Sequence, residues 1–67
     1  MNKQRILEHS FVLGHWAGEN KREENALKDS VFIEFLNTQT SDTDFRVDCF
    51  EQWYKGWNFG IKGAIMR

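Results

Sequence analysis

The chain has 67 residues, of which 40% are hydrophobic and 28% are charged, and its formal net charge is −1. A chain of this length forms at most one domain, and its single cysteine excludes a disulfide scaffold. The near-neutral charge gives no reason of its own to expect a nucleic-acid partner. We therefore expect one small domain over residues 1–67, with its own hydrophobic core.

The chain shows no sequence signal for a membrane. Its first residues contain no apolar run of signal-peptide length, and no stretch reaches the ~18 apolar residues of a membrane span. A lone free thiol, Cys49, is typical of a reducing compartment. We therefore expect a cytoplasmic protein that makes no membrane contact.

The first predicted element is a helix over residues 2–17. At about 100° per residue, Gly14 and Gly18 share its apolar face, so small residues lie where another helix would pack. Val12 and Trp16, one turn apart, lie on its polar side. These two side chains either contact the middle of the chain or form an exposed patch for a partner.

The middle segment, residues 21–36, is compatible with two structures. Asn20 and Glu23 have the spacing of a helix start signal, and apolar residues follow with helical spacing. However, Val31–Phe35 also suits a short strand, and Asp44–Cys49 alternates as a second strand would. A two-stranded hairpin needs a covering surface and would shorten the last helix.

The last predicted element is one long helix over residues 42–66. Polar residues fall on one side of it, aromatic residues on the next, and Gly56, Gly60 and Gly63 form a third stripe. Ser41 and Asp44 resemble a capping box, with aspartate in place of the usual glutamate. Each interior glycine costs ~1 kcal/mol relative to alanine, so we expect a close contact along the glycine stripe.

These elements predict an all-α domain of three helices. The first and third helices are expected to cross at their glycines, with two tryptophans packing alongside. The residues expected to have this structural role are Gly14, Gly18, Trp53, Gly56, Trp57 and Gly60. The alternative fold is α-β-β-α with a short hairpin.

The residues that usually carry catalysis or bind metals are not grouped. His9 and His15 lie on different faces of the predicted helix, and Cys49 is distant, whereas zinc needs three or four protein ligands. No glycine loop follows a strand to cradle a phosphate. We therefore expect no metal, no cofactor and no enzymatic activity.

Seven residues are candidates for contact with a partner. They are Val12, Trp16, Asp44, Asp48, Glu51, Lys55 and Lys62. The stretch Trp53–Trp57 interleaves a lysine with aromatic residues, which is typical of contacts with unpaired RNA bases. Its tryptophans also fall in the apolar arc, where they would pack in a core. A third interpretation is a homodimer that buries Val12 and Trp16.

Two stretches of the chain resemble the ribosome modulation factor family. Residues 8–18 contain Gly14, Ala17 and Gly18 in a glycine–aromatic–x–alanine–glycine pattern, with His15 where the family usually has tyrosine. Residues 52–57 resemble a glutamine–tryptophan–x–x–glycine–tryptophan stretch. The resemblance implies two glycine-crossed helices and binding to the small ribosomal subunit during hibernation, although members are strongly basic and this chain is slightly acidic.

The sequence thus predicts a small regulatory binding protein whose partner is a protein or a ribonucleoprotein complex, with RNA as a further contact. It would dock on the ribosome or on another RNA-containing complex. The alternative is an inhibitor or adaptor of the phage or mobile-element type, such as anti-CRISPR and anti-restriction proteins. That alternative is favoured if Asp42, Asp44, Asp48 and Glu51 form one exposed face, which could contact a basic nucleic-acid channel.

Overall fold

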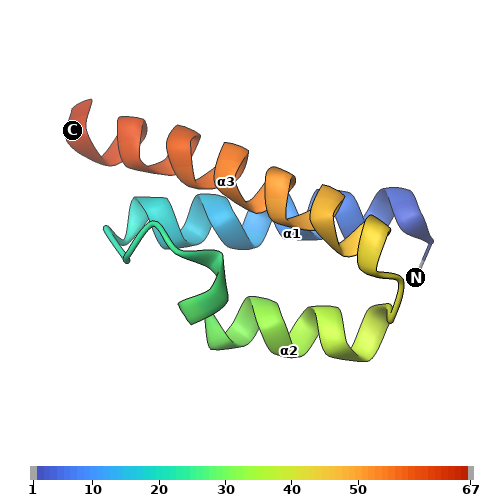
Figure 1. Cartoon of the computed structure of the whole chain (residues 1–67). Coiled ribbons are helices and arrows are strands. Elements are labelled where there is room, and N and C mark those ends of the chain that lie inside the picture. Colours follow the sequence, from blue (N-terminus) through green and yellow to red (C-terminus); the bar gives the residue numbers. More distant parts are fainter. Residues whose placement is uncertain (1, 67) are drawn as a thin grey trace.

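The structure, a computed structural model that describes residues 2–66, contains helices and, within those residues, no strand (Figure 1). Helix α1 spans Lys3–Glu19, the short 3-10 helix η1 spans Ala26–Lys28, α2 spans Ser30–Gln39 and α3 spans Thr43–Met66. Helices α1 and α3 run in the same direction, and α2 runs back between their ends on one side of the pair (Figure 1). The prediction of an all-α three-helix domain is confirmed, and the hairpin alternative is wrong for these residues.

The crossing of α1 and α3 is built on four glycines that bring backbone against backbone. A Cβ atom added at any of the four would overlap a carbonyl oxygen of the facing helix. The carbonyls belong to Trp53 and Trp57 opposite Gly14 and Gly18, and to Phe11 and His15 opposite Gly56 and Gly60. Contacts between glycine Cα–H groups and carbonyl oxygens are weakly attractive, so the close approach is itself stabilising. The predicted glycine-mediated crossing is confirmed.

Gly63 lies outside this crossing. A Cβ atom at Gly63 would meet nothing within 4 Å, so the expectation of close contact along the whole glycine stripe is wrong at its end. The reason is the length of α1, which ends at Glu19, level with Gly60. The last turns of α3 extend past that point, as its red end shows (Figure 1).

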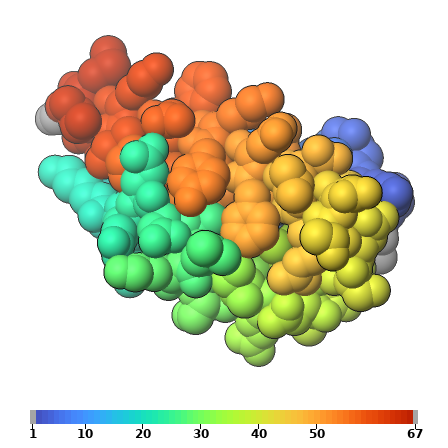
Figure 2. Space-filling model, viewed as in Figure 1, coloured from blue at the N-terminus to red at the C-terminus, as the bar shows by residue number. Residues whose placement is uncertain are grey.

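The hydrophobic core lies where α2 covers the crossing. Its largest fully buried side chains are Trp53, Phe32, Leu36, Cys49 and Ser10. The Phe32 ring meets Phe50 edge-on, with ring centroids 5.3 Å apart. Ser10 is polar but satisfied, since its hydroxyl donates to the Ile6 carbonyl oxygen at 2.8 Å. Figure 2 shows orange side chains from the middle of α3 seated against the green connection into α2.

The end of α1 depends on a lysine in a left-handed conformation. Lys21 has φ 54°, its N–H donates to Gly18 at 3.0 Å, and the next N–H, of Arg22, donates to Ala17 at 2.9 Å. This pair of bonds is the Schellman motif, in which glycine usually takes the left-handed position. Gly18 therefore does not break the helix, although its sequence context resembles a break.

Two aspartates, and not the predicted residues, start the later helices. The Asp42 side chain accepts from the N–H groups of Asp44 at 3.1 Å and Phe45 at 3.3 Å, so the predicted capping box at Ser41 is wrong by one residue. Helix α2 begins after Asp29, which caps it, and not after the start signal predicted at Asn20 and Glu23. The residues between α1 and α2 form a loop and the short helix η1, which lead the chain from the end of α1 to the start of α2.

Candidate functional site

Trp53 joins α3 to the start of α2. Its ring is fully buried, and its indole Nε1 donates to Asp29 Oδ2 at 2.8 Å. The other oxygen of that carboxylate, Oδ1, accepts the Phe32 N–H at 3.1 Å and caps α2. Hydrogen bonds to an ionised carboxylate are about twice as strong as neutral ones. Asp29 therefore fixes the position of α2 on α3 with both of its oxygens.

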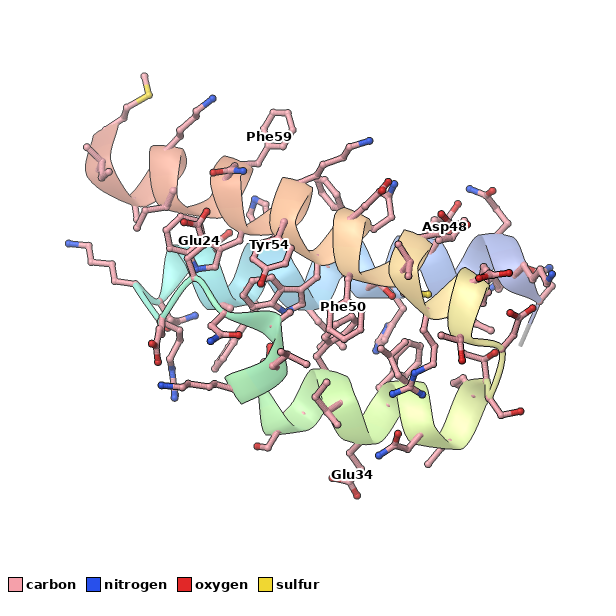
Figure 3. All side chains as sticks on the ribbon, viewed as in Figure 1. Glu24, Glu34, Asp48, Phe50, Tyr54 and Phe59 are labelled. Atoms are coloured by element: carbon pink, nitrogen blue, oxygen red, sulfur yellow. The ribbon has the colours of Figure 1, made fainter. Side chains whose placement is uncertain are left out.

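Tyr54 and Trp57 hold the connection that precedes α2. The Tyr54 hydroxyl accepts the Ala26 N–H at 3.3 Å, and the Trp57 Nε1 donates to the Arg22 carbonyl oxygen at 3.1 Å. Figure 3 shows Tyr54 directed from α3 toward this connection. The polar atoms of all three aromatic side chains are thus used inside the domain.

This arrangement bears directly on RNA stacking at residues 53–57. Trp53 has no exposed surface, so neither face of its ring is open to a base. Tyr54 and Trp57 are only partly exposed, and they lie against the α1–α2 connection. Lys55 points to solvent, but its aromatic neighbours do not form an open platform beside it.

Of the two alternatives for Val12 and Trp16, the structure shows an exposed patch on α1, and residues from other elements extend it. Trp16 is 52% exposed and Val12, one turn earlier, is 57% exposed. The Arg22 guanidinium carbon lies 5.3 Å from the Trp16 ring centroid, a cation–π contact. Trp16 and Arg22 line a hollow of about 300 Å³ together with Val31 of α2, which is 60% exposed. We call Val12, Trp16, Arg22 and Val31 the Trp16 surface.

The charged candidates lie together on the outer side of α3. Asp44, Asp48 and Glu51 in its first half and Lys55 and Lys62 in its second half are all exposed, and we call these five residues the α3 stripe. Within residues 2–66, none of their side chains forms an ion pair within 4.0 Å. The Glu51–Lys55 pair that one-turn spacing predicts is therefore not formed. Asp42 is exposed too, but its carboxylate is engaged as the cap of α3.

The structure does not bring the two sets of candidates together. On α1, Val12 and Trp16 point about 160° away from Gly14 and Gly18, which face α3. On α3, the stripe is turned away from the glycines that face α1. The Trp16 surface and the α3 stripe therefore lie on opposite outer sides of the crossing, and they cannot form one continuous site.

The cysteine and the two histidines lie in three separate places. Burial raises the pKa of the Cys49 thiol, which therefore stays protonated near neutral pH. His15 Nδ1 lies 2.8 Å from a Glu19 oxygen on the surface of α1, and the His9 ring lies against Phe35. Among residues 2–66, no three His, Cys, Asp or Glu side chains are placed to hold a metal ion, and no helix is long and apolar enough to cross a membrane.

Reasoning from the sequence missed three residues of these sites. Asp29 carries a detectable signal, because an aspartate two residues before the run Val31–Leu36 is a standard helix cap. Arg22 and Val31 carry no such signal in the sequence. They reach Trp16 only because the left-handed turn at Lys21 returns the chain toward α1.

The two stretches that resemble the ribosome modulation factor family meet at the helix crossing. Gly14 and Gly18 from the first face the backbone of Trp53 and Trp57 from the second, so in this chain the pattern serves packing. Packing positions carry information about fold and not about function. Comparison of the chain with protein-family models, with curated proteins and with solved structures finds no significant match.

Proposed function

We propose that the protein is a small non-enzymatic regulatory binding protein that docks on a protein partner through the Trp16 surface. The observation that carries the proposal is the half-exposed indole of Trp16, placed beside the exposed side chains of Val12 and Val31. Tryptophan is among the side chains that most often dominate the energy of protein interfaces. An inhibitor or adaptor of the phage or mobile-element type would use such a surface.

The local geometry supports docking by insertion of a partner side chain. Arg22 lies over the Trp16 ring and restricts its motion, so less side-chain entropy is lost on binding. The hollow between Trp16 and Val31 is large enough for one apolar side chain. Lys28 and Glu23, which also line the hollow, lie 3.4 Å from each other. The surface therefore offers apolar contact from Trp16 and the two valines, together with one cation, Arg22.

A second candidate function is docking on the ribosome or another ribonucleoprotein complex. The resemblance of residues 8–18 and 52–57 supports it, as do the exposed side chains of Lys55 and Lys62. Both lysines share the α3 stripe with Asp48 and Glu51, however, and these acids would repel phosphate. We therefore rank this candidate second.

Capture from cell lysate with single-residue variants separates the two candidates. The full chain is immobilised as wild type, Trp16→Ser and Ile65→Ser, each with its helix content verified by circular dichroism. Ile65 is the matched control because it is an exposed apolar residue of another helix, on the last turns of α3 beyond the glycine crossing. A Trp16 hot spot predicts that Trp16→Ser lowers partner affinity at least about 30-fold, whereas Ile65→Ser has no effect.

Treating the lysate with nuclease completes the test. Docking on a protein predicts capture that survives nuclease and depends weakly on salt. If capture requires RNA, falls steeply with salt and is lost in a Lys55→Glu/Lys62→Glu variant but not in Trp16→Ser, the ribonucleoprotein candidate replaces the first. Equal loss of capture in Ile65→Ser would contradict a role specific to Trp16.

A further inference from the structure

The α3 stripe carries a charge pattern that no ion pair among residues 2–66 uses, although Asp44 lies in the first turn of α3, where an acid complements the helix dipole. Its three acids occupy the first half of α3 and its two lysines the second half, all exposed. The Lys28–Glu23 ion pair lies elsewhere, in the α1–α2 connection, and the contact between His15 and Glu19 lies on α1. Neither α1 nor α2 covers this side of α3, because both pack against its glycine and aromatic faces.

We propose that two copies of the chain associate through their α3 stripes, with the two helices antiparallel about a two-fold axis. Glu51 of one copy then faces Lys55 of the other. Asp44 precedes Glu51 by about two helical turns, and Lys62 follows Lys55 by the same distance, so this register also places Asp44 opposite Lys62. Asp48 faces the neutral Asn58. Because a two-fold contact is self-complementary, each opposite-charge pair occurs twice.

The charge pattern specifies the direction as well as the register. A parallel contact in register would place each acid against an acid and each lysine against a lysine, and such like-charge contacts disfavour a wrong arrangement. Exposed apolar side chains also border the stripe. Val47 is 53% exposed on one edge. Phe59 is 63% exposed on the other edge, which borders α1, and its ring centroid lies 5.9 Å from that of Phe11 (Figure 3).

The size of the contact indicates a weak dimer. Helix α3 has 24 residues, so it is about 36 Å long, and a helix is about 10 Å across. A single pair of helices of this length lies at the small end of specific interfaces. Its exposed ion pairs are also screened by salt, so dimerisation should be strongest at low ionic strength.

A dimer of this kind would leave both Trp16 surfaces open, because they lie on the opposite side of the crossing. Two such surfaces in one particle would raise the avidity for a partner that repeats its binding site. The dimer proposal itself does not depend on the function proposed for Trp16.

Charge-reversal variants of the full chain test the proposal by sedimentation equilibrium. The Asp44→Lys/Glu51→Lys variant makes the stripe mainly basic, and the Lys55→Glu/Lys62→Glu variant makes it acidic. We expect each variant alone to raise the dimer dissociation constant at least about tenfold, since four surface ion pairs are replaced by repulsion. An equimolar mixture of the two variants should form a heterodimer. Raising NaCl from about 0.05 to about 0.5 M should weaken both dimers.

Several results would overturn the proposal. One is a wild-type chain that stays monomeric at millimolar concentration and low salt. Another is a mixture of the two variants that stays monomeric while circular dichroism shows both folded. A wild-type dimer that survives both reversals but is lost in Val12→Ser/Trp16→Ser would place the contact on the Trp16 surface instead.

Discussion

Substituting alanine for glycine at two positions of α3 should have opposite effects on stability. Both Gly56 and Gly63 lie inside the helix, so each gains up to ~1 kcal/mol of helix propensity when replaced by alanine. At Gly63 the added methyl group meets nothing within 4 Å, so that gain is retained. At Gly56 the methyl group would overlap the Phe11 carbonyl oxygen and lie 2.8 Å from the His15 nitrogen.

The cost at Gly56 follows from what the methyl group would meet. Both neighbouring atoms belong to the backbone of α1 and cannot rotate away, so the two helices must separate by about 1 Å to restore ordinary contact distances. Overpacking of this kind typically costs ~1–3 kcal/mol, and more where backbones collide. A domain of this length has about 3–10 kcal/mol of stability in total. Gly56→Ala should therefore be about 2–3 kcal/mol less stable than Gly63→Ala.

Thermal unfolding followed by circular dichroism measures this difference directly. In a domain of this size 1 kcal/mol shifts Tm by about 4–8 °C, so Gly63→Ala should melt a few degrees above wild type. Gly56→Ala should melt at least about 8 °C below Gly63→Ala. Equal melting temperatures for the two variants would show that Gly56 is not at a tight crossing, and the reasoning would be refuted.

Three other predictions follow from the remaining contacts. Asp29→Ala removes both the α2 cap and the acceptor of the Trp53 indole, so it should cost about 2–4 kcal/mol in chemical denaturation, whereas Asp29→Asn, which keeps a cap, should cost less. Trp53→Phe should lower the free energy of unfolding more than Trp57→Phe does. Trp53 is fully buried and donates to a carboxylate, whereas Trp57 is partly exposed and donates to the Arg22 carbonyl oxygen. Equal losses of unfolding free energy in a urea titration would contradict this order. Because the pKa of the Cys49 thiol is raised in the folded chain, the unfolded chain loses the thiol proton at a lower pH. The contribution of this thiol to stability is therefore complete below about pH 9 and is lost as the pH rises further. The free energy of unfolding should be measured from about pH 8.5 to about pH 10.5, and it should fall more steeply in wild type than in Cys49→Ala. Parallel curves of unfolding free energy against pH would contradict the burial of the thiol.

The parts of the fold that could be predicted are those where residue size decides the contact. Gly14, Gly18, Gly56 and Gly60 lie at one-turn spacing on helical faces, and such a pattern has few uses besides close helix packing. Periodicity alone could not show that Gly63 differs. That depends on where α1 ends, and α1 runs to Glu19, two residues past the end predicted at residue 17, before the chain turns at Lys21 in a left-handed conformation.

The middle of the chain was harder to predict because its contacts are distant in sequence. The start of α2 is set by Asp29, whose second oxygen is engaged by Trp53, a residue 24 positions away. The candidate binding residues show the same limit. Val12 and Trp16 could be placed on the polar side of a helix from periodicity, but their exposure depends on how much of α1 the middle segment covers.

The direction of α1 and α3 explains why the two candidate surfaces lie where they do. Two helices that run in parallel must be joined by a connection that returns along their length, and α2 with η1 makes that return (Figure 1). The return path covers one side of the crossing and buries Phe32 and Leu36 there. The glycines bring α1 and α3 into contact through their backbones. The outer sides of the two helices therefore do not have to pack against another element. Exposed residues at these two sides, Trp16 on one and the α3 stripe on the other, are therefore available for partners.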